Sequence, residues 1–309
     1  MNSIRTDLTI EAAELCGGVD GIEGCNVEEV EYKGVKVTTV DILTDGAAQK
    51  IGKPVGRYIT LQSKAIRTGE SQEYEAITQL LQRHISDLTK GKSNVLIVGL
   101  GNRSITPDAL GPKAAEQISV TRHLTEQKII TNAHVPVISA IAPGVLGVTG
   151  IETGEIIKGV VDKTRPDIII AIDALAAHSM ERVTTTIQLS DTGIIPGSGV
   201  GNRRNALTEE TLGVPVVAVG VPTVVDAAAV ANDSLDMLAL AAKENAGEDS
   251  QLYKSIKNLE NENRLTLIKH VLNPFVGSLI VTPTEIDSII DHVSMIIAEG
   301  INLALVGNI

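Results

Sequence analysis

Two aspartates follow apolar runs in a way that could bring them into one reactive site. Asp108 lies in the loop behind the run Val95–Val98, and Asp173 directly follows the run Ile168–Ile172. In open parallel sheets the ligand crevice lies outside the carboxyl ends of the strands. Two carboxylates held close together cannot both ionise easily, so one keeps a proton and the other acts as a base. If the two strands are neighbours, this pair predicts acid–base hydrolysis. Asp108 on its own could also be a helix cap.

The loop that carries Asp108 allows a second interpretation, a phosphate site. Gly99-Leu100-Gly101-Asn102 begins like a dinucleotide fingerprint, but Ser104 stands where the third glycine is needed. No G-K-[ST] follows, so a P-loop is excluded. Gly99 and Gly101 let the backbone turn sharply as it leaves the strand. We therefore expect Gly99, Gly101 and Asn102 to shape a site that presents an acid.

Two further glycine-rich stretches could form walls of the site. They are APGVLGVTGIETGE, which contains Gly144 and Gly147, and PGSGVGN, which contains Gly199. Ordinary connecting loops are the alternative for both stretches. The six histidines show no H-E-x-x-H spacing, and His178 is either a surface residue or a base or metal ligand near Asp173.

The elements that would position these residues follow from the pattern of apolar side chains. Alternation predicts a hairpin over 27–43 and a strand over 58–61, and helical spacing covers 71–88. Short apolar strands are expected at 94–98, 136–140, 167–172 and 215–219, with helices at 7–15, 109–120 and 285–297. Residues 242–264 are highly charged and predict a solvated helical excursion, and 273–284 has strand-like composition.

This alternation predicts an α/β fold with a mainly parallel sheet flanked by helices. Residues 1–90 would form an N-terminal β-rich elaboration on an α/β core over 91–309, and we expect 1–309 to be a single domain. Hydrophobic residues make up 43% of the 309 residues, and aromatic residues only 2%. Such a core of Val, Ile, Leu and Ala suits buried parallel strands.

Composition also limits the partners and the compartment. The net charge of -12 disfavours direct binding of nucleic acid, which normally needs a basic face. The N-terminus lacks the apolar core of a signal peptide, and no run is long enough for a membrane span. Cys16 and Cys25 are expected to be reduced and structural. We expect a cytoplasmic protein without a membrane partner.

Long stretches of the chain resemble the germination protease family of spore-forming bacteria. They include VLIVGLGNRSITPDALGP, RPDIIIAIDALAA, DTGIIPGSGVGNRRN and PTVVDAA, together with RTDLTIEA near the N-terminus. The resemblance implies an endopeptidase that degrades small acid-soluble spore proteins during germination, in the forespore and spore core. It also implies a homotetramer that is made as a zymogen and processes itself.

The resemblance further assigns residues. The two essential aspartates of the family match Asp108 and Asp173, and the sheet is similar to that of hydrogenase maturation peptidases, which are phosphorylase/hydrolase-like. Those relatives bind metal through two acids and a histidine, and no histidine here could be assigned that place. We therefore expect no metal or other cofactor, and an atypical aspartic mechanism. A metal-dependent endopeptidase that uses the same two acids, or a nucleotide-binding regulatory module on Gly99–Asn102, are the alternatives.

The N-terminal segment suggests where self-cleavage occurs. Family members cut after an acidic residue and before an apolar one, and Thr6-Asp7-Leu8-Thr9 has that character. We expect self-cleavage between Asp7 and Leu8. Family zymogens usually carry a longer leader before this motif, whereas Met1–Ile4 alone precede Arg5 here, so we expect a very short propeptide or a different form of latency.

Overall fold

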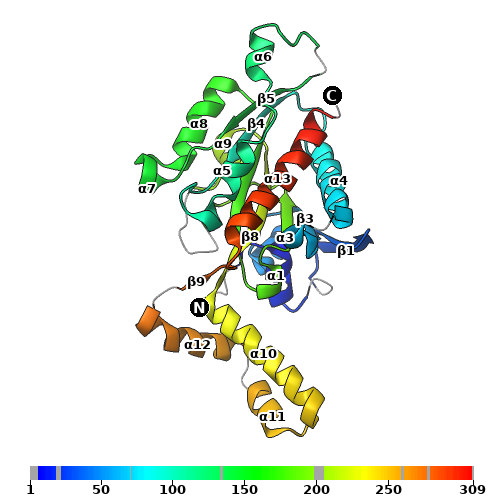
Figure 1. The fold of residues 1–309 in the computed structure, drawn as a ribbon, viewed down its shortest axis with the longest axis vertical. Helices are drawn as coiled ribbons and strands as arrows, with labels where there is room; N and C mark the ends of the chain where they lie inside the picture. Colours follow the sequence, from blue (N-terminus) through cyan, green and yellow to red (C-terminus); the bar gives the residue numbers. More distant parts are fainter. Residues whose placement is uncertain are drawn as a thin grey trace.

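One mixed β-sheet organises the molecule (Figure 1). The computed structural model describes residues 6–18, 22–69, 71–132, 135–197, 205–258, 261–276 and 279–307. The strands follow the order β1-β2-β3-β7-β8-β6-β4-β5, and β9 pairs with β8. Their bounds are β1 (Cys25–Tyr32), β2 (Val35–Ile42), β3 (Gly56–Gln62), β4 (Asn94–Gly99), β5 (Val137–Ile141), β6 (Ile168–Ala177), β7 (Thr186–Ser190), β8 (Val216–Asp226) and β9 (Ile280–Val281).

The sheet has a parallel half and an antiparallel half. Strands β8, β6, β4 and β5 run parallel to one another, as expected for the α/β core. Strands β1, β2, β3 and β7 extend the same sheet with antiparallel pairs. The N-terminal β-rich elaboration is therefore continuous with the core sheet, and parallel order is confined to one half.

Helices cover both faces of the sheet. The helices are α1 (Thr9–Leu15), α2 (Asp45–Ile51), α3 (Ala65–Thr68), α4 (Ser71–Leu88), α5 (Leu110–Ala115), α6 (Arg122–Glu126), α7 (Leu146–Thr149), α8 (Thr153–Thr164), α9 (Glu209–Leu212), α10 (Ala227–Ala246), α11 (Gln251–Lys257), α12 (Asn261–Val276) and α13 (Ile286–Leu305). Two 3-10 helices, η2 (Thr106–Asp108) and η3 (Met180–Arg182), lie between them.

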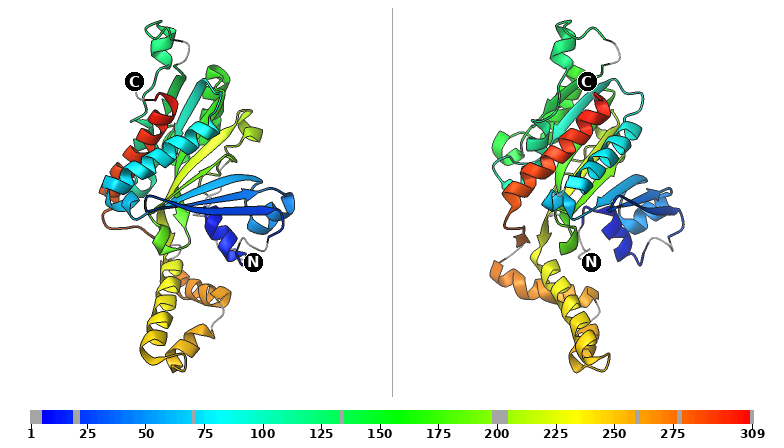
Figure 2. Two further views of the ribbon diagram at one scale, coloured as in Figure 1. Left: turned by 90° about the vertical axis from the view of Figure 1, so that its right-hand side faces the viewer. Right: turned by 45° about the vertical axis from the view of Figure 1, so that its right-hand side comes forward.

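The two faces of the sheet bury different cores. The largest core lies under α4, α5 and α13, where alternate residues such as Ile170 and Ile172 of β6 face these helices. Figure 2 shows α4 and α13 side by side across that face. The intervening residues Ile169 and Ala171 face α8 and α9 on the opposite side. On that same opposite face, α1 packs beside the carboxyl end of β6 and α2 packs on the antiparallel half.

Several predicted elements are confirmed and others need correction. The hairpin, the strand near 58–61 and the helix over 71–88 are present. The helix expected over 109–120 ends at Ala115, and the strand-like stretch 273–284 contains the end of α12 and a strand of two residues. Strand β8 continues through Pro222 to Asp226, because its neighbour β6 continues alongside it.

A helical arm formed by α10, α11 and α12 projects from the end of β8 (Figure 1). It is longer than the charged excursion expected at 242–264, and it begins where the Asp226 side chain caps the Ala228 amide. Its two ends meet, since Ala227 N–H donates to Leu279 O over 2.9 Å. The arm therefore leaves and re-enters the core at one place.

Helix α13 alone among the helices of the described residues is long and apolar enough to cross a membrane, and 50% of that stretch is buried inside the protein. It packs against α4 and α5 over the sheet. Burial in the core accounts for its apolar composition.

Candidate active site

A group of glycines closes the end of β4 against helix α5. Gly99 is the last residue of β4, and a side chain there would collide with the Gly111 carbonyl and the Ala115 methyl group. Gly111 in turn lies against the backbone of Leu100 and Ile172, with no room for a Cβ atom. Helix α5 can therefore approach the ends of β4 and β6 at backbone distance.

The loop after β4 binds its own acid. Asp108 lies at the end of η2, and its Oδ2 accepts a hydrogen bond of 2.8 Å from Asn102 N–H. Gly101, with φ of 113°, packs directly against the Asp108 backbone. Asn102 Oδ1 accepts from Ser104 N–H over 3.0 Å, which fixes the turn. A phosphate bound by this loop would need the Asn102 N–H as a hydrogen-bond donor, but the Asp108 carboxylate already accepts that bond. This contact argues against the nucleotide-binding alternative.

Asp173 lies inside β6 and not after its end as predicted. The strand continues to Ala177 because β8 pairs with it beyond Ile172, and Asp173 pairs with Gly220. The neighbouring strand β4 ends at Gly99, opposite Ile172, so Asp173 lies just beyond the end of β4. Asp173 is 4% exposed, and its Oδ1 accepts from Ala174 N–H over 2.9 Å.

The two aspartates both lie near the carboxyl end of β4, where β4 pairs with β6. Leu100 N–H donates to Ile172 O over 2.8 Å, which joins the residue before Gly101 to the residue before Asp173. Gly101 packs against the backbone of Asp108. This one hydrogen bond therefore links the backbone beside Asp108 to the residue that precedes Asp173. The condition set by the sequence, that the two strands be neighbours, is met.

The other predicted site residues are more scattered. Gly144 follows β5 with φ of 76°, and its carbonyl accepts from Thr153 Oγ1 over 3.1 Å. Gly147 lies in α7 with open space around its α-carbon, so nothing here packs against it. Gly199 lies outside the described residues. Within the part of the chain that the structure describes, no three His, Cys, Asp or Glu side chains are grouped as metal ligands.

The two cysteines are free thiols. Cys16 is exposed after α1, and Cys25 begins β1. Partial burial, together with the charge of Asp41, raises the pKa of the Cys25 thiol. A raised pKa lowers the reactive thiolate fraction, which agrees with the structural role expected from the sequence.

A row of side chains connects Asp173 to the antiparallel half of the sheet. Asp173 and Gln188 both pair with Gly220, from opposite sides, and Gln188 pairs with Thr60 on β3. Directly paired residues point to the same face, which is the face away from Ile172 and Leu189. Gly220 has no side chain, and Leu175 leans across it. Sequence reasoning missed Gln188, a buried polar residue between two apolar neighbours.

The N-terminal segment lies on this row. Asp7 N–H donates to Ala176 O over 3.1 Å, and Asp7 Oδ2 accepts from Ala176 N–H over 2.9 Å. Leu8 is 0% exposed and packs against Leu175 and its neighbours. The Gln188 amide reaches both sides of the Asp7–Leu8 bond, donating to Asp7 O over 3.4 Å and accepting from Thr9 N–H over 2.7 Å.

A buried carboxylate fastens α1 to the end of β6. Glu11 is 2% exposed and accepts hydrogen bonds from the backbone amides of His178 and Ser179, over 2.7 Å and 2.9 Å. It also accepts from Thr6 Oγ1 and lies 3.7 Å from Arg182. Together these groups hold the N-terminal segment beside β6, and we call Thr6–Leu15 with these partners the N-terminal clamp.

The fold defines an α/β protein in which two aspartates lie near the carboxyl end of β4. The sequence comparisons give this class a family. The family model described as germination protease matches residues 7–255 and 243–309. The chain therefore belongs to the germination protease family, and it is a protease with a role in spore germination.

Individual relatives agree over nearly the whole chain. A germination protease of Caldanaerobacter subterraneus subsp. tengcongensis is 48% identical over 305 residues, which cover 98% of this chain and 94% of the relative. Those of Priestia megaterium and Bacillus subtilis are 42% and 41% identical, covering 98% of this chain and 94% and 93% of theirs. These matches confirm the resemblance seen in the sequence motifs.

Among solved structures, the chain is similar to the [NiFe] hydrogenase maturation protease HycI of Thermococcus kodakarensis KOD1. The match has 19% identity and a TM-score of 0.29, and it covers 45% of this chain and 80% of that one.

Proposed function

We propose that this chain is an endopeptidase that cleaves small acid-soluble spore proteins with Asp108 and Asp173 as its catalytic pair. The observation that supports the proposal is that Asp173 on β6 and the loop after β4 that carries Asp108 lie beside each other just beyond the end of β4. Family membership supports proteolysis and a spore protein as substrate.

The proposed reaction divides the work between the two acids. One carboxylate takes a proton from a water molecule as its oxygen attacks the scissile carbonyl carbon. The other, protonated, donates a hydrogen bond to the carbonyl oxygen and then gives its proton to the leaving amine. Each carboxylate accepts one backbone N–H, from Asn102 and from Ala174 respectively. These contacts do not distinguish the acid from the base, and a coupled pair titrates as a unit.

The test is cleavage of a purified small acid-soluble spore protein by the wild type, Asp108→Asn and Asp173→Asn. Asp167→Asn is the matched control, because Asp167 precedes the same strand β6 at its opposite end. We expect both site variants to lose activity by at least about 100-fold, as loss of an acid or base does, and the control to keep it. Full activity in either site variant would overturn the proposal.

The same assay addresses the metal-dependent alternative. Each protein is assayed with and without a strong chelator, followed by metal add-back. We expect no effect of the chelator on the wild type. Chelator-sensitive cleavage that returns with added metal would replace the aspartic mechanism by one in which the same two acids are metal ligands.

We also propose that the chain is made as a zymogen and cuts itself between Asp7 and Leu8. Support comes from the N-terminal clamp. Gln188, which lies in the same row of paired residues and on the same sheet face as Asp173, binds the carbonyl of this bond. Intact mass spectrometry of the full chain over time should show loss of residues 1–7. A fully active protein with an intact RTDL segment would contradict this part of the proposal.

We propose a homotetramer in the spore core as the working form. Large apolar side chains are exposed on the arm, including Met237, Leu240 and Val271 at 65%, 59% and 62%. Such side chains favour burial between copies. Light scattering of the wild type should give the mass of four chains, and Leu240→Glu is expected to reduce it if the arm takes part in assembly.

A further inference from the structure

The carbonyl of the Asp7–Leu8 bond is held by two side-chain donors. Lys53 Nζ donates to Asp7 O over 2.8 Å and to Thr6 O over 3.2 Å. Gln188 Nε2 donates to the same Asp7 oxygen over 3.4 Å. Lys53 follows α2 and Gln188 lies on β7, so two distant parts of the chain converge on one carbonyl oxygen.

The amide nitrogen of the same bond is also held. Leu8 N–H donates to Thr6 Oγ1 over 3.1 Å, and Thr6 Oγ1 donates to the buried Glu11 carboxylate. The Leu8 side chain is fully buried, and Thr9 N–H is bound by Gln188. The bond therefore has a fixed orientation, with its oxygen towards Lys53.

A fixed ammonium on a carbonyl oxygen is the arrangement that stabilises an oxyanion. When a nucleophile adds to a carbonyl carbon, the oxygen gains negative charge, and preorganised donors aimed at that oxygen lower the barrier. A charged donor is stronger than a neutral amide, and the Lys53 contact is the shorter of the two.

We propose that Lys53 is a catalytic residue of self-cleavage, polarising the Asp7 carbonyl and stabilising the oxyanion, with Gln188 as second donor. This inference rests on the proposed cut between Asp7 and Leu8 and adds the group that activates its carbonyl. In self-cleavage it gives Lys53, and not the protonated aspartate, the hydrogen bond to the carbonyl oxygen, while the two aspartates activate water and protonate the leaving group.

The chemistry balances without a proton from Lys53. The water oxygen forms a bond to the Asp7 carbonyl carbon as one aspartate takes the water proton. The C–N bond to Leu8 then breaks, and the Leu8 nitrogen receives the proton of the other aspartate. Lys53 stays an ammonium throughout, and its hydrogen bond is strongest while the oxygen carries negative charge.

The electrostatic surroundings of Lys53 suit this role. Burial removes water from the ammonium and lowers the pKa of Lys53, whereas the nearby Asp7 and Glu11 carboxylates act in the opposite direction. A poorly hydrated cation interacts more strongly with a developing charge than a fully hydrated one. Self-cleavage should accordingly slow as pH rises through this lowered pKa, because the ammonium is lost.

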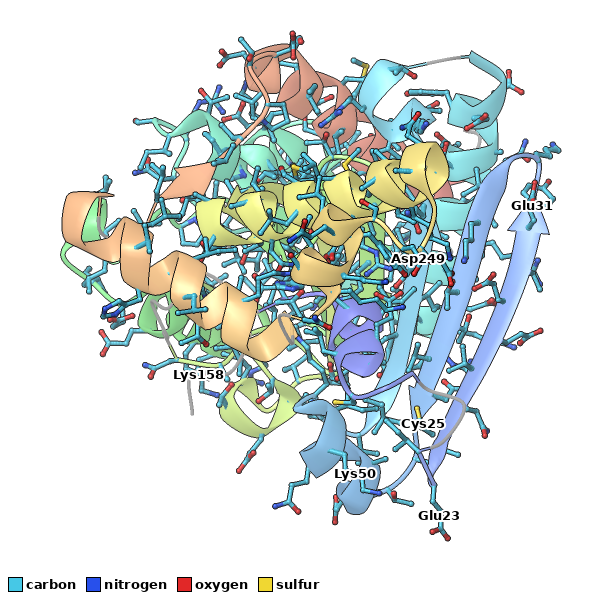
Figure 3. All side chains as sticks on the ribbon, turned by 90° about the horizontal axis from the view of Figure 1, so that it is seen from below. Glu23, Cys25, Glu31, Lys50, Lys158 and Asp249 are labelled. Carbon is cyan, nitrogen blue, oxygen red and sulfur yellow. The ribbon has the colours of Figure 1, made fainter. Side chains whose placement is uncertain are left out.

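The test follows conversion of the full chain by intact mass spectrometry in the wild type, Lys53→Met and Lys53→Arg. Lys50→Met is the matched control, because Lys50 is an exposed lysine on α2, labelled in Figure 3. We expect Lys53→Met to convert at least about 100-fold more slowly, the usual cost of removing an oxyanion donor. Lys53→Arg should recover part of the rate, and Lys50→Met should match the wild type.

A second readout separates catalysis from simple anchoring of the segment. In the wild type the conversion rate should fall at alkaline pH, and in Lys53→Arg this fall should disappear because arginine keeps its proton. Thermal unfolding of each variant checks that the fold persists. Conversion of folded Lys53→Met at the wild-type rate, or equal slowing and identical pH profiles in both Lys53 variants, would overturn the role of Lys53.

The proposed function fails in a different way. A wild-type chain that never converts, or that is cut at another bond, would remove the Asp7–Leu8 cleavage itself. A wild-type chain that converts at Asp7–Leu8 equally fast with methionine at position 53 would leave the cleavage site intact and remove only this inference.

Discussion

The carboxyl end of β4 with Asp108 and Asp173, which we call the aspartate edge, lies on the same sheet as the N-terminal clamp. The two regions are built in opposite ways. At the aspartate edge, glycines let the backbone of α5 approach the backbone at the strand ends. Each acid accepts a hydrogen bond from a nearby backbone amide. In the N-terminal clamp, Glu11 of the segment binds backbone amides after β6, and Gln188 binds the backbone of the segment, as does Lys53 beside the clamp.

Under the proposed function, one sheet separates reaction from recognition. Backbone packing positions the acids with little conformational freedom, which suits the catalytic role proposed for them. The clamp depends on many side-chain contacts, so its binding is specific to the N-terminal segment. Substitutions at the aspartate edge should therefore lower both activity and stability, whereas substitutions in the clamp should lower mainly stability.

The largest effect is expected from Gly111→Ala at the aspartate edge. A methyl group there meets the backbone of Leu100 and Ile172, so α5 must move away from the strand ends. We expect a loss of more than about 3 kcal/mol in unfolding free energy and of about 100-fold or more in cleavage rate. Urea unfolding and substrate cleavage measure both.

Gly147→Ala is the control for that change. Its α-carbon faces open space within α7, so the same substitution should leave activity intact and add up to about 1 kcal/mol of stability. If the two variants behaved alike, backbone packing would not be what positions the acids.

Leu8→Ala should weaken the clamp by about 3 kcal/mol, because Leu8 is fully buried and the truncation leaves a cavity. Leu15→Ala, on the same N-terminal segment but 43% exposed, should cost less than about 1 kcal/mol. Chemical denaturation of the unprocessed chain gives both values. Equal losses would mean that burial of Leu8 does not hold the segment.

Glu11→Gln should cost about 2 kcal/mol or more in unfolding free energy. It removes a buried charge that accepts from His178 and Ser179 and that lies beside Arg182. Glu14→Gln is matched to it, since Glu14 also binds Arg182 but its side chain is 53% exposed, and it should cost less than about 1 kcal/mol. If Glu14→Gln lowered the unfolding free energy more than Glu11→Gln, the exposed ion pair and not the buried carboxylate would stabilise the clamp.

The smallest effect is expected at Asp167, an exposed carboxylate at the other end of β6 from Asp173. Hydrogen bonds from the Ser93 and Asn94 amides lower the pKa of Asp167. A lowered folded pKa stabilises the fold above the pKa of the unfolded carboxyl, and this contribution is lost as pH falls through the folded pKa. Asp167→Asn should cost at most about 1 kcal/mol after solvent screening.

The pH dependence provides the check on Asp167. Unfolding free energies of the wild type and Asp167→Asn should differ at neutral pH and converge on acidification. A difference that persists below the pKa of Asp167 would show that hydrogen bonding by the neutral side chain, and not its charge, joins the start of β4 to β6.

Local patterns predicted the elements whose stability is largely local. The alternation in 27–43 and the helical spacing of Tyr74, Ile77 and Leu81 both correspond to observed elements. Strand β7 was missed because its alternate side chains Thr186, Gln188 and Ser190 are polar yet buried. The extension of β8 was missed because Pro222 resembles a turn signal, and pairing with β6 overrides it.

The same difference between local patterns and long-range contacts applies to the candidate site. Asp108 and Asp173 could be proposed from the sequence because each is an acid that follows an apolar run. Lys53 and Gln188 could not, since their contacts join residues 46 and 181 positions from Asp7. No pattern within a short window carries such information, and only the topology of the whole sheet, including the antiparallel half with α2, brings those residues together.

The junction of the helical arm has a consequence for how this family can diversify. The arm departs at Ala227 and returns at Leu279, and β9 seals the junction by pairing Val225 with Val281 and Asp226 with Ile280. A segment whose ends are fastened together can lengthen, shorten or change sequence at little cost to what lies beneath it. The family model matches this chain in two stretches that overlap within the arm, 7–255 and 243–309. The arm is in this sense a replaceable module, whose surface can change without moving the sheet to which it is attached.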